Sequence, residues 1–300
     1  METILLAGGS GLIGTRLVEL LKDKYKIHIL TRSPEQDEEN VKYFHWDIYK
    51  KEADRKAFVC DYIINLNGAG IADKRWTTQR KKVLIDSRVE ANRTIALMLA
   101  KTDQRPKGIF CASAMGYYGD SGDRLLNEDS PEGKGFLAEC CAIWEESSSA
   151  LKPFAKQFGM IRIGLVLAKE GGALPKLLMT KSIGMVPYFG DGSQYFSWIH
   201  IDDLCGMFMH MIEHPEVNGI FNGVAPVALT NKALASAICD ALPGSQITVP
   251  APSFPIRLAM GEMADVILNS NRIAESRISL EHGYKYQFGE IDVALGDLLG

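Results

Sequence analysis

Several kinds of segment are missing from this chain of 300 residues. No stretch approaches the ~20 consecutive apolar residues that a membrane-spanning helix needs. No run of Lys and Arg suggests a basic tail, and the net charge of −4 gives no attraction to nucleic acid or to an anionic membrane surface. The first residues lack the basic segment and the small-residue cleavage site of a signal peptide. We therefore expect a cytoplasmic protein that binds neither nucleic acid nor a membrane.

Cysteine and histidine motifs are also missing. The six cysteines form no Cys-x-x-Cys pair and mostly lie in apolar surroundings, which predicts reduced and buried thiols. The adjacent Cys140 and Cys141 leave a redox-sensing role open. The histidines show no metal-ligand spacing, so no metal site is expected.

The chain does contain an alternation of short apolar runs with longer helical patterns. Strands are expected over residues 3–7, 26–30, 41–46, 61–66, 108–113 and 158–167. Helices are expected over residues 12–22, 78–102, 137–151, 204–214 and 231–241. This alternation predicts an α/β Rossmann fold, a doubly wound parallel sheet with helices on both faces and a smaller C-terminal substrate lobe. We expect residues 1–165 to form the Rossmann domain, with about 200–230 returning to it, and residues 166–300 to form mainly the lobe.

A glycine-rich loop joins the first expected strand to the first expected helix, and it reads AGGSGLIG over residues 7–14. The first glycine allows a tight turn, the second lets backbone N–H groups approach a pyrophosphate, and the third lets the helix pack on the strand. The N-terminus of the helix then offers free N–H groups to the phosphates. The residues predicted to bind a dinucleotide here are Gly8, Ser10, Gly11, Leu12, Ile13 and Gly14.

The end of the second expected strand decides which dinucleotide is favoured. An NAD site places an acidic residue there, whereas this chain has Thr31, Arg32 and Ser33. A guanidinium can hold a 2′-phosphate or stack on the adenine, so NADP(H) is the predicted cofactor. Asp47, after the third strand, is a candidate for the adenine amino group or an exposed turn residue.

Another loop is expected beside the cofactor ribose. Leu66, Asn67 and Gly68 end the fourth expected strand, at the carboxyl edge of the sheet where ligands bind in such folds. We therefore add these three residues to the predicted cofactor site.

With these residues placed, the chain resembles the extended and atypical members of the short-chain dehydrogenase/reductase superfamily. It is most similar to the epimerase family proteins, a group like the NAD-dependent epimerases and dehydratases with a C-terminal domain of unknown function. The resemblance spans nearly the whole chain. It rests on the stretches IADKRWT (71–77), DSRV (86–89), SAMGYYG (113–119), RIGLVLAKEGGAL (162–174), FGDGSQYFSWIHIDDL (189–204), FNGVAPVALTN (221–231) and PAPSFPIRLAMGEMADVIL (250–268).

This resemblance implies a Rossmann domain with a small substrate lobe, NADP(H) as cofactor, and the family's C-terminal domain over about 248–300. Arg88 matches a position whose family counterpart contacts the cofactor, and a surface cation is the alternative. Leu167 matches a backbone contact near the nicotinamide, and a core residue is the alternative.

The chemistry of the superfamily uses a serine, a tyrosine and a lysine four residues after the tyrosine. No Tyr-x-x-x-Lys occurs here: Phe136 is followed by Cys140, and Leu137 by Cys141. Ser113 follows the fifth expected strand, where the serine belongs. The remaining candidates for the proton are Tyr117, Tyr118, Lys134 and a bound water; for Ser113 and the two tyrosines, strand-end and packing roles stay open.

A histidine beside two carboxylates, in WIHIDDL, invites a metal or catalytic interpretation. We favour a structural one, in which Asp202 or Asp203 caps the helix that follows and His200 anchors the chain beneath the cleft. Gln194, Tyr195 and Trp198 are expected to line the substrate pocket.

Two functions remain. The first is an NADP(H)-dependent oxidoreductase or epimerase-like enzyme acting on a small polar carbonyl or a sugar-derived substrate, with a homodimer as the candidate assembly. The second is a non-enzymatic NADP(H)-binding sensor of redox state. The missing Tyr–Lys pair favours the sensor, whereas a second lobe over the nicotinamide favours the enzyme.

Overall fold

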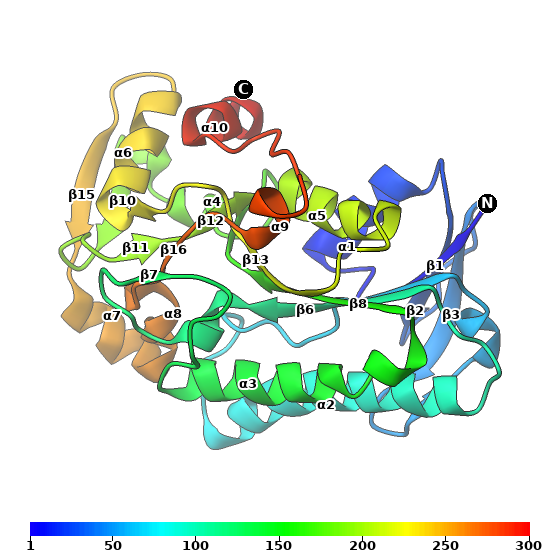
Figure 1. Cartoon of the computed structure of the whole chain (residues 1–300). Coiled ribbons are helices and arrows are strands. Elements are labelled where there is room, and N and C mark those ends of the chain that lie inside the picture. The colour runs from blue at the N-terminus through cyan, green and yellow to red at the C-terminus, as the bar shows by residue number, and fades with distance from the viewer.

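The computed structural model describes residues 1–300 and is built on an eight-stranded sheet (Figure 1). The strand order is β13-β8-β6-β5-β1-β2-β3-β4, and every neighbouring pair is parallel except β3 with β4. The strands are β1 (Thr3–Ala7), β2 (Lys26–Thr31), β3 (Val41–Asp47), β4 (Glu52–Ala53), β5 (Tyr62–Asn65), β6 (Gly108–Ala114), β8 (Gln157–Ile163) and β13 (Gly219–Gly223). Chain order reverses direction across the sheet between β1 and β5, which creates a switch point for ligand binding.

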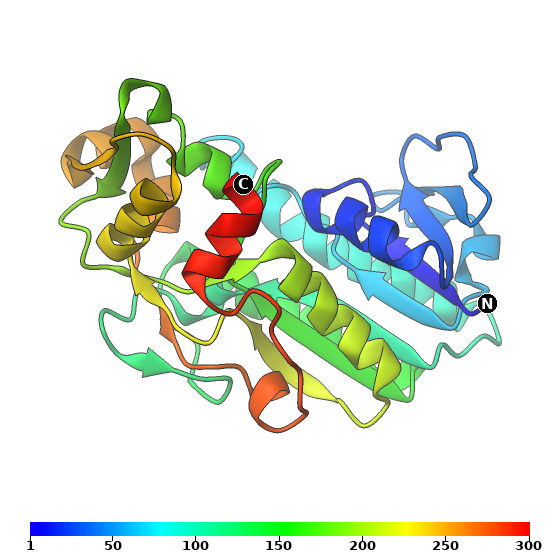
Figure 2. The ribbon, with the colours of Figure 1, turned by 90° about the horizontal axis from the view of Figure 1, so that it is seen from above.

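Helices cover both faces of this sheet, as Figures 1 and 2 show. One face carries α1 (Leu12–Leu21) and α5 (Ile201–Glu213), whose apolar side chains join a core cluster of 24 buried residues. The other face carries α2 (Thr78–Ala100), with α3 (Phe136–Ser149) packed beside it, over a cluster of 17 buried residues. The predicted α/β Rossmann fold is therefore confirmed.

The smaller lobe lies beyond the carboxyl ends of the strands and has its own core of 14 buried residues. Its strands form four two-stranded sheets: β9 (Leu165–Leu167) with β12 (Trp198–His200), β10 (Met185–Phe189) with β15 (Ile247–Ala251), β11 (Tyr195–Phe196) with β14 (Leu229–Thr230), and β7 (Leu125–Leu126) with β16 (Arg272–Ile273). Its helices are α4 (Leu174–Leu177), α6 (Asn231–Ala241), α7 (Ser253–Met260), α8 (Asp265–Leu268) and α10 (Ile291–Leu299). Helix α9 (Arg277–Leu280) instead packs against β13, and its Ile278 belongs to the core cluster of the large sheet. Short 3₁₀ turns are η1 (Arg55–Phe58), η2 (Met115–Tyr118), η3 (Lys152–Phe154), η4 (Lys181–Ile183) and η5 (Gly261–Ala264).

One expected strand proves to be two. The apolar run 158–167 divides at Gly164 into β8, inside the large sheet, and β9, which pairs with β12. Gly164 has no room for a side chain, because a Cβ there would stand 2.9 Å from Val224 Cγ1 and would collide with Ser197 O. A close crossing of three chain segments therefore breaks the strand, and apolarity alone does not reveal such a crossing.

No helix in the structure is both long enough and apolar enough to cross a membrane.

Candidate functional site

The glycine loop is packed so tightly that Gly8 and Gly14 cannot be replaced without movement. Gly8 has φ +84°, and a Cβ there would lie 2.9 Å from the carbonyl carbon of Leu66. A Cβ at Gly14 would collide with Gly8 O and would stand 2.7 Å from Gly9 Cα. The loop at β1 is thus pressed against the loop that follows β5, at the switch point of the sheet.

The first turn of α1 is open to an anion. Gly11 is its N-cap residue and makes no side-chain hydrogen bond to the helix, and the first turn contains no acidic residue. The first main-chain bond inside the helix is donated by Thr15 to Gly11 O (2.8 Å), so the N–H groups of Leu12, Ile13 and Gly14 remain free. Free N–H groups and the partial positive charge of a helix end are the features with which helix N-termini bind phosphate groups.

The side chains that end β2 and β3 lie at the same edge of the sheet, because Thr31 is paired with His45. The Thr31 hydroxyl is held in a local turn with Ser33, while Arg32 is exposed and makes no ion pair or hydrogen bond with the protein. Asp47 accepts hydrogen bonds from the amides of Tyr49 (3.0 Å) and Lys50 (3.1 Å). These two bonds, that of Lys50 foremost, lower the pKa of Asp47.

The loop after β5 holds the next predicted residues in place. Asn67 donates its side-chain amide to Ser87 O (2.9 Å) and its backbone N–H to Asn65 Oδ1 (3.1 Å). A Cβ at Gly68 would stand 3.0 Å from the guanidinium carbon of Arg88. Gly8, Leu66, Asn67, Gly68 and Arg88 are therefore neighbours, although two different loops and a helix carry them.

Arg88 has a half-buried guanidinium with no carboxylate partner. Its Nη1 donates to the carbonyls of Leu84 (2.8 Å) and Ala69 (3.2 Å), and its Cζ lies 4.6 Å over the ring of Trp144. Burial lowers the pKa of Arg88, whose guanidinium also lies close to the thiols of Cys140 and Cys141. A cation from α2 thus lies beside the α3 positions where the superfamily's lysine is absent.

The thiols themselves are poorly suited to redox sensing. Cys140 and Cys141 are buried and unbonded to any other cysteine. Burial raises the pKa of Cys141 to about 12 and also raises that of Cys140, which keeps both in the less reactive protonated form.

Ser113 ends β6 in a buried hydrogen-bond network. Its hydroxyl donates to Glu145 Oε1 (2.7 Å), and both oxygens of that carboxylate receive the guanidinium of Arg162 (2.8 and 2.9 Å). The side chains of Arg162 and Glu145 are only 4% and 9% exposed. A hydroxyl that donates to a carboxylate can still accept a hydrogen bond but cannot donate one to a substrate oxygen.

The two tyrosines of η2 differ in what they can reach. Tyr118 is 1% exposed; its hydroxyl donates to Asn222 Oδ1 (2.7 Å) and accepts from Arg162 Nη1 (2.9 Å). Tyr117 is half-buried and its hydroxyl makes no hydrogen bond with the protein. The ring of Tyr117 lies on the Arg162 guanidinium, 3.6 Å from Cζ to the ring centre. Of the pair, only Tyr117 has a free hydroxyl.

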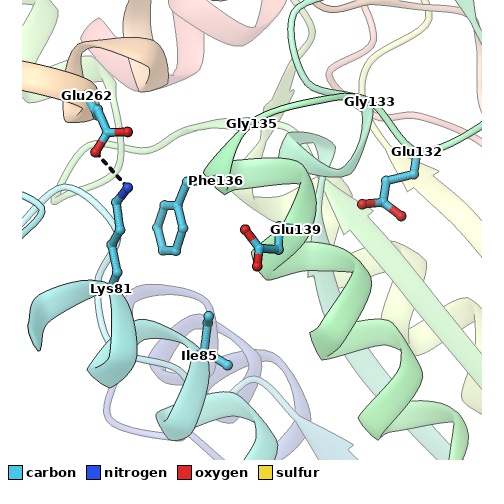
Figure 3. A pocket seen from close by; sticks show the side chains of 8 residues that line it. All are labelled: Lys81, Ile85, Glu132, Gly133, Gly135, Phe136, Glu139 and Glu262. Atoms are coloured by element: carbon cyan, nitrogen blue, oxygen red, sulfur yellow. Dashed lines mark ion pairs between the residues drawn. The ribbon is translucent and has the colours of Figure 1, made fainter. Parts of the chain in front are cut away.

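A pocket of about 470 Å³ opens at the N-terminus of α3 (Figure 3). Phe136 and Ile85 form its apolar wall, and Lys81 stands over the Phe136 ring with Nζ 4.7 Å from the ring centre. The same Nζ pairs with Glu262 of η5 at 2.6 Å, so the C-terminal segment closes one side. The pocket therefore lies between the Rossmann domain and the lobe, beside the positions that lack the catalytic tyrosine. Its other lining residues are Glu132, Gly133, Gly135 and Glu139.

Leu167 is completely buried in the core of the lobe, where its strand pairs with β12 opposite His200. Trp198 was expected to line the substrate pocket, but it is a core residue, 1% exposed, and its Nε1 donates to Val227 O (3.1 Å). Gln194 lines a second pocket of about 760 Å³ in the lobe. Tyr195 is half-buried, with the Arg272 guanidinium 5.0 Å from its ring centre.

The expected helix cap at Asp202 or Asp203 is wrong. Helix α5 begins at Ile201, and the side chain of His200 caps it by accepting the amide of Asp202 (3.1 Å). Asp202 instead pairs with Arg16 of α1 (2.6 and 2.8 Å). Asp203 accepts the backbone N–H groups of Gln287 and Phe288 (2.7 and 2.9 Å) and so anchors the segment before α10.

Four residues that shape the site were not predicted: Trp144, Glu145, Arg162 and Lys81. A signal existed for one of them, since Arg162 is a charge inside an otherwise apolar strand, and such a residue needs a buried partner. Nothing local in the sequence identifies Glu145 as that partner.

The glycine loop at the switch point, the uncapped α1 and the position of Ser113 define a Rossmann-type protein of short-chain dehydrogenase/reductase architecture. Comparisons with known proteins agree. The sequence profile of the NAD dependent epimerase/dehydratase family matches residues 4–139, and that of a domain of unknown function (DUF1731) matches residues 251–298.

Relatives match over the whole chain. Epimerase family protein SDR39U1 of Bos taurus is 33% identical over 301 residues, and this alignment covers 99% of each chain. Epimerase family protein SH2119 of Staphylococcus haemolyticus is 30% identical over 302 residues, covering 100% of this chain and 99% of the relative. The crystal structure of human epimerase family protein SDR39U1 (isoform2) with NADPH has a TM-score of 0.88 and 30% identity, covering 99% of both chains. The chain belongs to the epimerase family proteins of the short-chain dehydrogenase/reductase superfamily.

More distant structures show only the fold. MoeE5 in complex with UDP-glucose and NAD has a TM-score of 0.77 at 14% identity.

Proposed function

We propose that this chain is an NADP(H)-dependent oxidoreductase or epimerase-like enzyme. The observation that carries the proposal is the pairing of an uncapped α1 N-terminus with an unpaired, exposed Arg32 at the end of β2. The first feature suits a pyrophosphate, and the second suits a 2′-phosphate. The NADPH in the structure of the human relative supports the same assignment.

The residues proposed to hold the cofactor fit it in shape as well as in charge. A Cβ at Gly8 or Gly14 would fill or displace the cradle, which explains why glycine stands at both positions. We assign the dinucleotide to Gly8, Ser10, Gly11, Leu12, Ile13, Gly14, Thr31, Arg32, Asp47, Leu66, Asn67, Gly68, Arg88 and Leu167. When bound, the nicotinamide supplies hydride-transfer chemistry.

For the proton we propose Tyr117. Its free hydroxyl and its place directly after β6 support this role, whereas the hydroxyls of Ser113 and Tyr118 are committed to Glu145, Asn222 and Arg162. The Arg162 guanidinium against the Tyr117 ring orients that ring. The substrate we propose is a small polar carbonyl or a sugar-derived compound, admitted through the pocket between Phe136 and Glu262.

The alternative is a non-enzymatic NADP(H)-binding sensor of redox state. Two observations favour it. Helix α3 contains neither a tyrosine nor a lysine, and Ser113 cannot donate to a substrate while it donates to Glu145. A homodimer and a cytoplasmic location remain predictions for both functions.

One experiment separates the two. The chain is titrated with NADPH by calorimetry and then screened for NADPH consumption against polar aldehydes, ketones and oxidised sugars. Turnover that Tyr117→Phe abolishes while NADPH affinity is retained supports the enzyme; the exposed Tyr49→Phe serves as the matched control. Tight binding without turnover on any compound supports the sensor.

A further inference from the structure

A hairpin from the lobe lies on the first residue of α1. Residues 168–171 form its tip, which is closed by an antiparallel bridge between Leu167 and Gly172 and by the bond from Ala173 N to Val166 O (3.0 Å). The contact to α1 is made by the glycines of this hairpin. A Cβ at Gly171 would stand 3.2 Å from Leu12 Cδ1, and one at Gly172 would stand 3.4 Å from Leu12 Cδ2.

The backbone of this hairpin is strongly determined. Gly171 and Gly172 have φ values of +102° and +65°, which other residues rarely adopt, so the tip has one defined shape. Ala168, at the other side of the tip, is 2% exposed and belongs to the core cluster against which Leu12 and Ile13 pack. Both ends of the tip are thus fixed against the α1 N-terminus, and only Lys169 and Glu170 project from it.

The charged side chains at the tip of the hairpin have no partner within the protein. Lys169 is exposed and makes no ion pair or hydrogen bond within the protein, and the same holds for Glu170. The turn that the hairpin touches is the one whose N–H groups are free and whose helix end carries partial positive charge. A lysine side chain has about four rotatable bonds and reaches a neighbouring anion as a point charge.

We propose that Lys169 closes over the pyrophosphate of the bound dinucleotide, so that the pyrophosphate is held between the α1 N-terminus and the hairpin 168–171 of the lobe. This rests on the proposed function, because it requires a dinucleotide at the glycine loop. The hairpin leads directly from β9 into α4, whose Leu174 and Leu177 are buried in the core of the lobe. Cofactor binding would therefore fix the position of the lobe relative to the sheet.

The test uses three ligands and measures dissociation constants by calorimetry on the full chain. NADPH and NADH share the pyrophosphate, whereas 2′-AMP carries a 2′-phosphate and no pyrophosphate. Lys169→Met is expected to weaken NADPH and NADH alike by roughly tenfold, the loss of one charge-assisted contact, and to leave 2′-AMP unchanged. The same variant should show a shallower loss of affinity with added salt.

Two further variants serve as controls for the effect of Lys169→Met. Glu170→Gln removes the repelling charge from the same tip and is expected to strengthen both dinucleotides about two- to threefold. Lys176→Met, an exposed lysine on α4 in the same lobe, is the matched control and should change nothing. Melting temperatures that agree with the unsubstituted chain exclude a folding defect.

The outcomes are distinguishable. If NADPH binds the unsubstituted chain but Lys169→Met binds both dinucleotides unchanged, the assignment of Lys169 is overturned while the proposed function stands. A loss confined to NADPH places Lys169 at the 2′-phosphate and also overturns it. If the unsubstituted chain does not bind NADPH, the proposed function fails, and this assignment fails with it.

Discussion

Arg162 on β8 and Glu145 on α3 form a two-pronged ion pair, with Nε and Nη2 of the arginine 2.8 and 2.9 Å from the two carboxylate oxygens. The pair is buried, and it gathers the hydroxyls of Ser113 and Tyr118 on either side. Burying two charges is favourable only when geometry and extra hydrogen bonds compensate the loss of water, and this network meets both conditions. The pair thereby fixes α3 against the sheet at the site and provides the surface on which Tyr117 rests.

Breaking the ion pair should lower the free energy of unfolding much more than removing a surface charge does. Glu145→Gln leaves the Arg162 charge buried without a carboxylate, and the expected loss in the free energy of unfolding is about 3–5 kcal/mol. The neighbouring exposed Glu146→Gln should change it by less than about 0.5 kcal/mol. Urea unfolding of both variants tests this prediction. Equal free energies of unfolding would show that the ion pair makes no net contribution to stability.

Close packing of the glycine loop can be tested in the same way. Gly14→Ala forces α1 away from the Gly8 carbonyl, and we expect a loss of about 1–3 kcal/mol in stability, together with loss of dinucleotide binding. Gly296→Ala on α10 meets no atom within 4 Å, so it should raise stability by about 0.5–1 kcal/mol. We therefore predict stability changes of opposite sign for the two variants, and thermal unfolding measures them. If Gly14→Ala were as stable as the unsubstituted chain, the glycine loop would not be tightly packed.

Stability should depend on pH through His200. Burial lowers the pKa of this ring, whose Nδ1 must stay unprotonated to accept the amide of Asp202. The unfolded chain takes up a proton near the ordinary histidine pKa of about 6.5, while the folded chain does not. The contribution of neutral His200 to the free energy of unfolding is therefore fully present above about pH 6.5. It is lost as the pH falls from that value toward the lowered pKa of the folded state.

The variant that isolates this effect is His200→Asn, because asparagine is also a good cap. Urea unfolding at about pH 7.5 and about pH 5.5 should show a smaller difference between the two conditions than in the unsubstituted chain. His28 and His210, whose pKa values burial also lowers, supply the remaining dependence. Identical differences in both proteins would contradict the role of His200.

The sequence predicted the sheet and its glycine loop because these depend on short-range patterns. Apolar runs bounded by glycines gave β1 and β6 within one residue at each end, and the helical period gave α1 and α6 equally closely. These elements follow from local burial and turn chemistry, which a reader of the sequence can see directly.

The rest depends on contacts between distant residues. Asp202 or Asp203 was expected to cap α5, but Asp202 pairs with Arg16, 186 positions away, and Asp203 accepts the amide of Gln287. The ring of His200 caps the helix instead. The break at Gly164 and the partnership of Arg162 with Glu145 have the same origin. The absence of a tyrosine–lysine pair was visible in the sequence, whereas the committed hydroxyls of Ser113 and Tyr118 were not.

The central claim is that Arg32 recognises the 2′-phosphate of a dinucleotide whose pyrophosphate lies on the α1 N-terminus. Calorimetric titration of the unsubstituted chain and of Arg32→Asp with NADPH and NADH tests it most directly. We expect the unsubstituted chain to prefer NADPH, and Arg32→Asp to lose about a hundredfold in NADPH affinity while NADH affinity changes by less than about threefold. Equal losses for both dinucleotides, or no binding of NADPH by the unsubstituted chain, would contradict it.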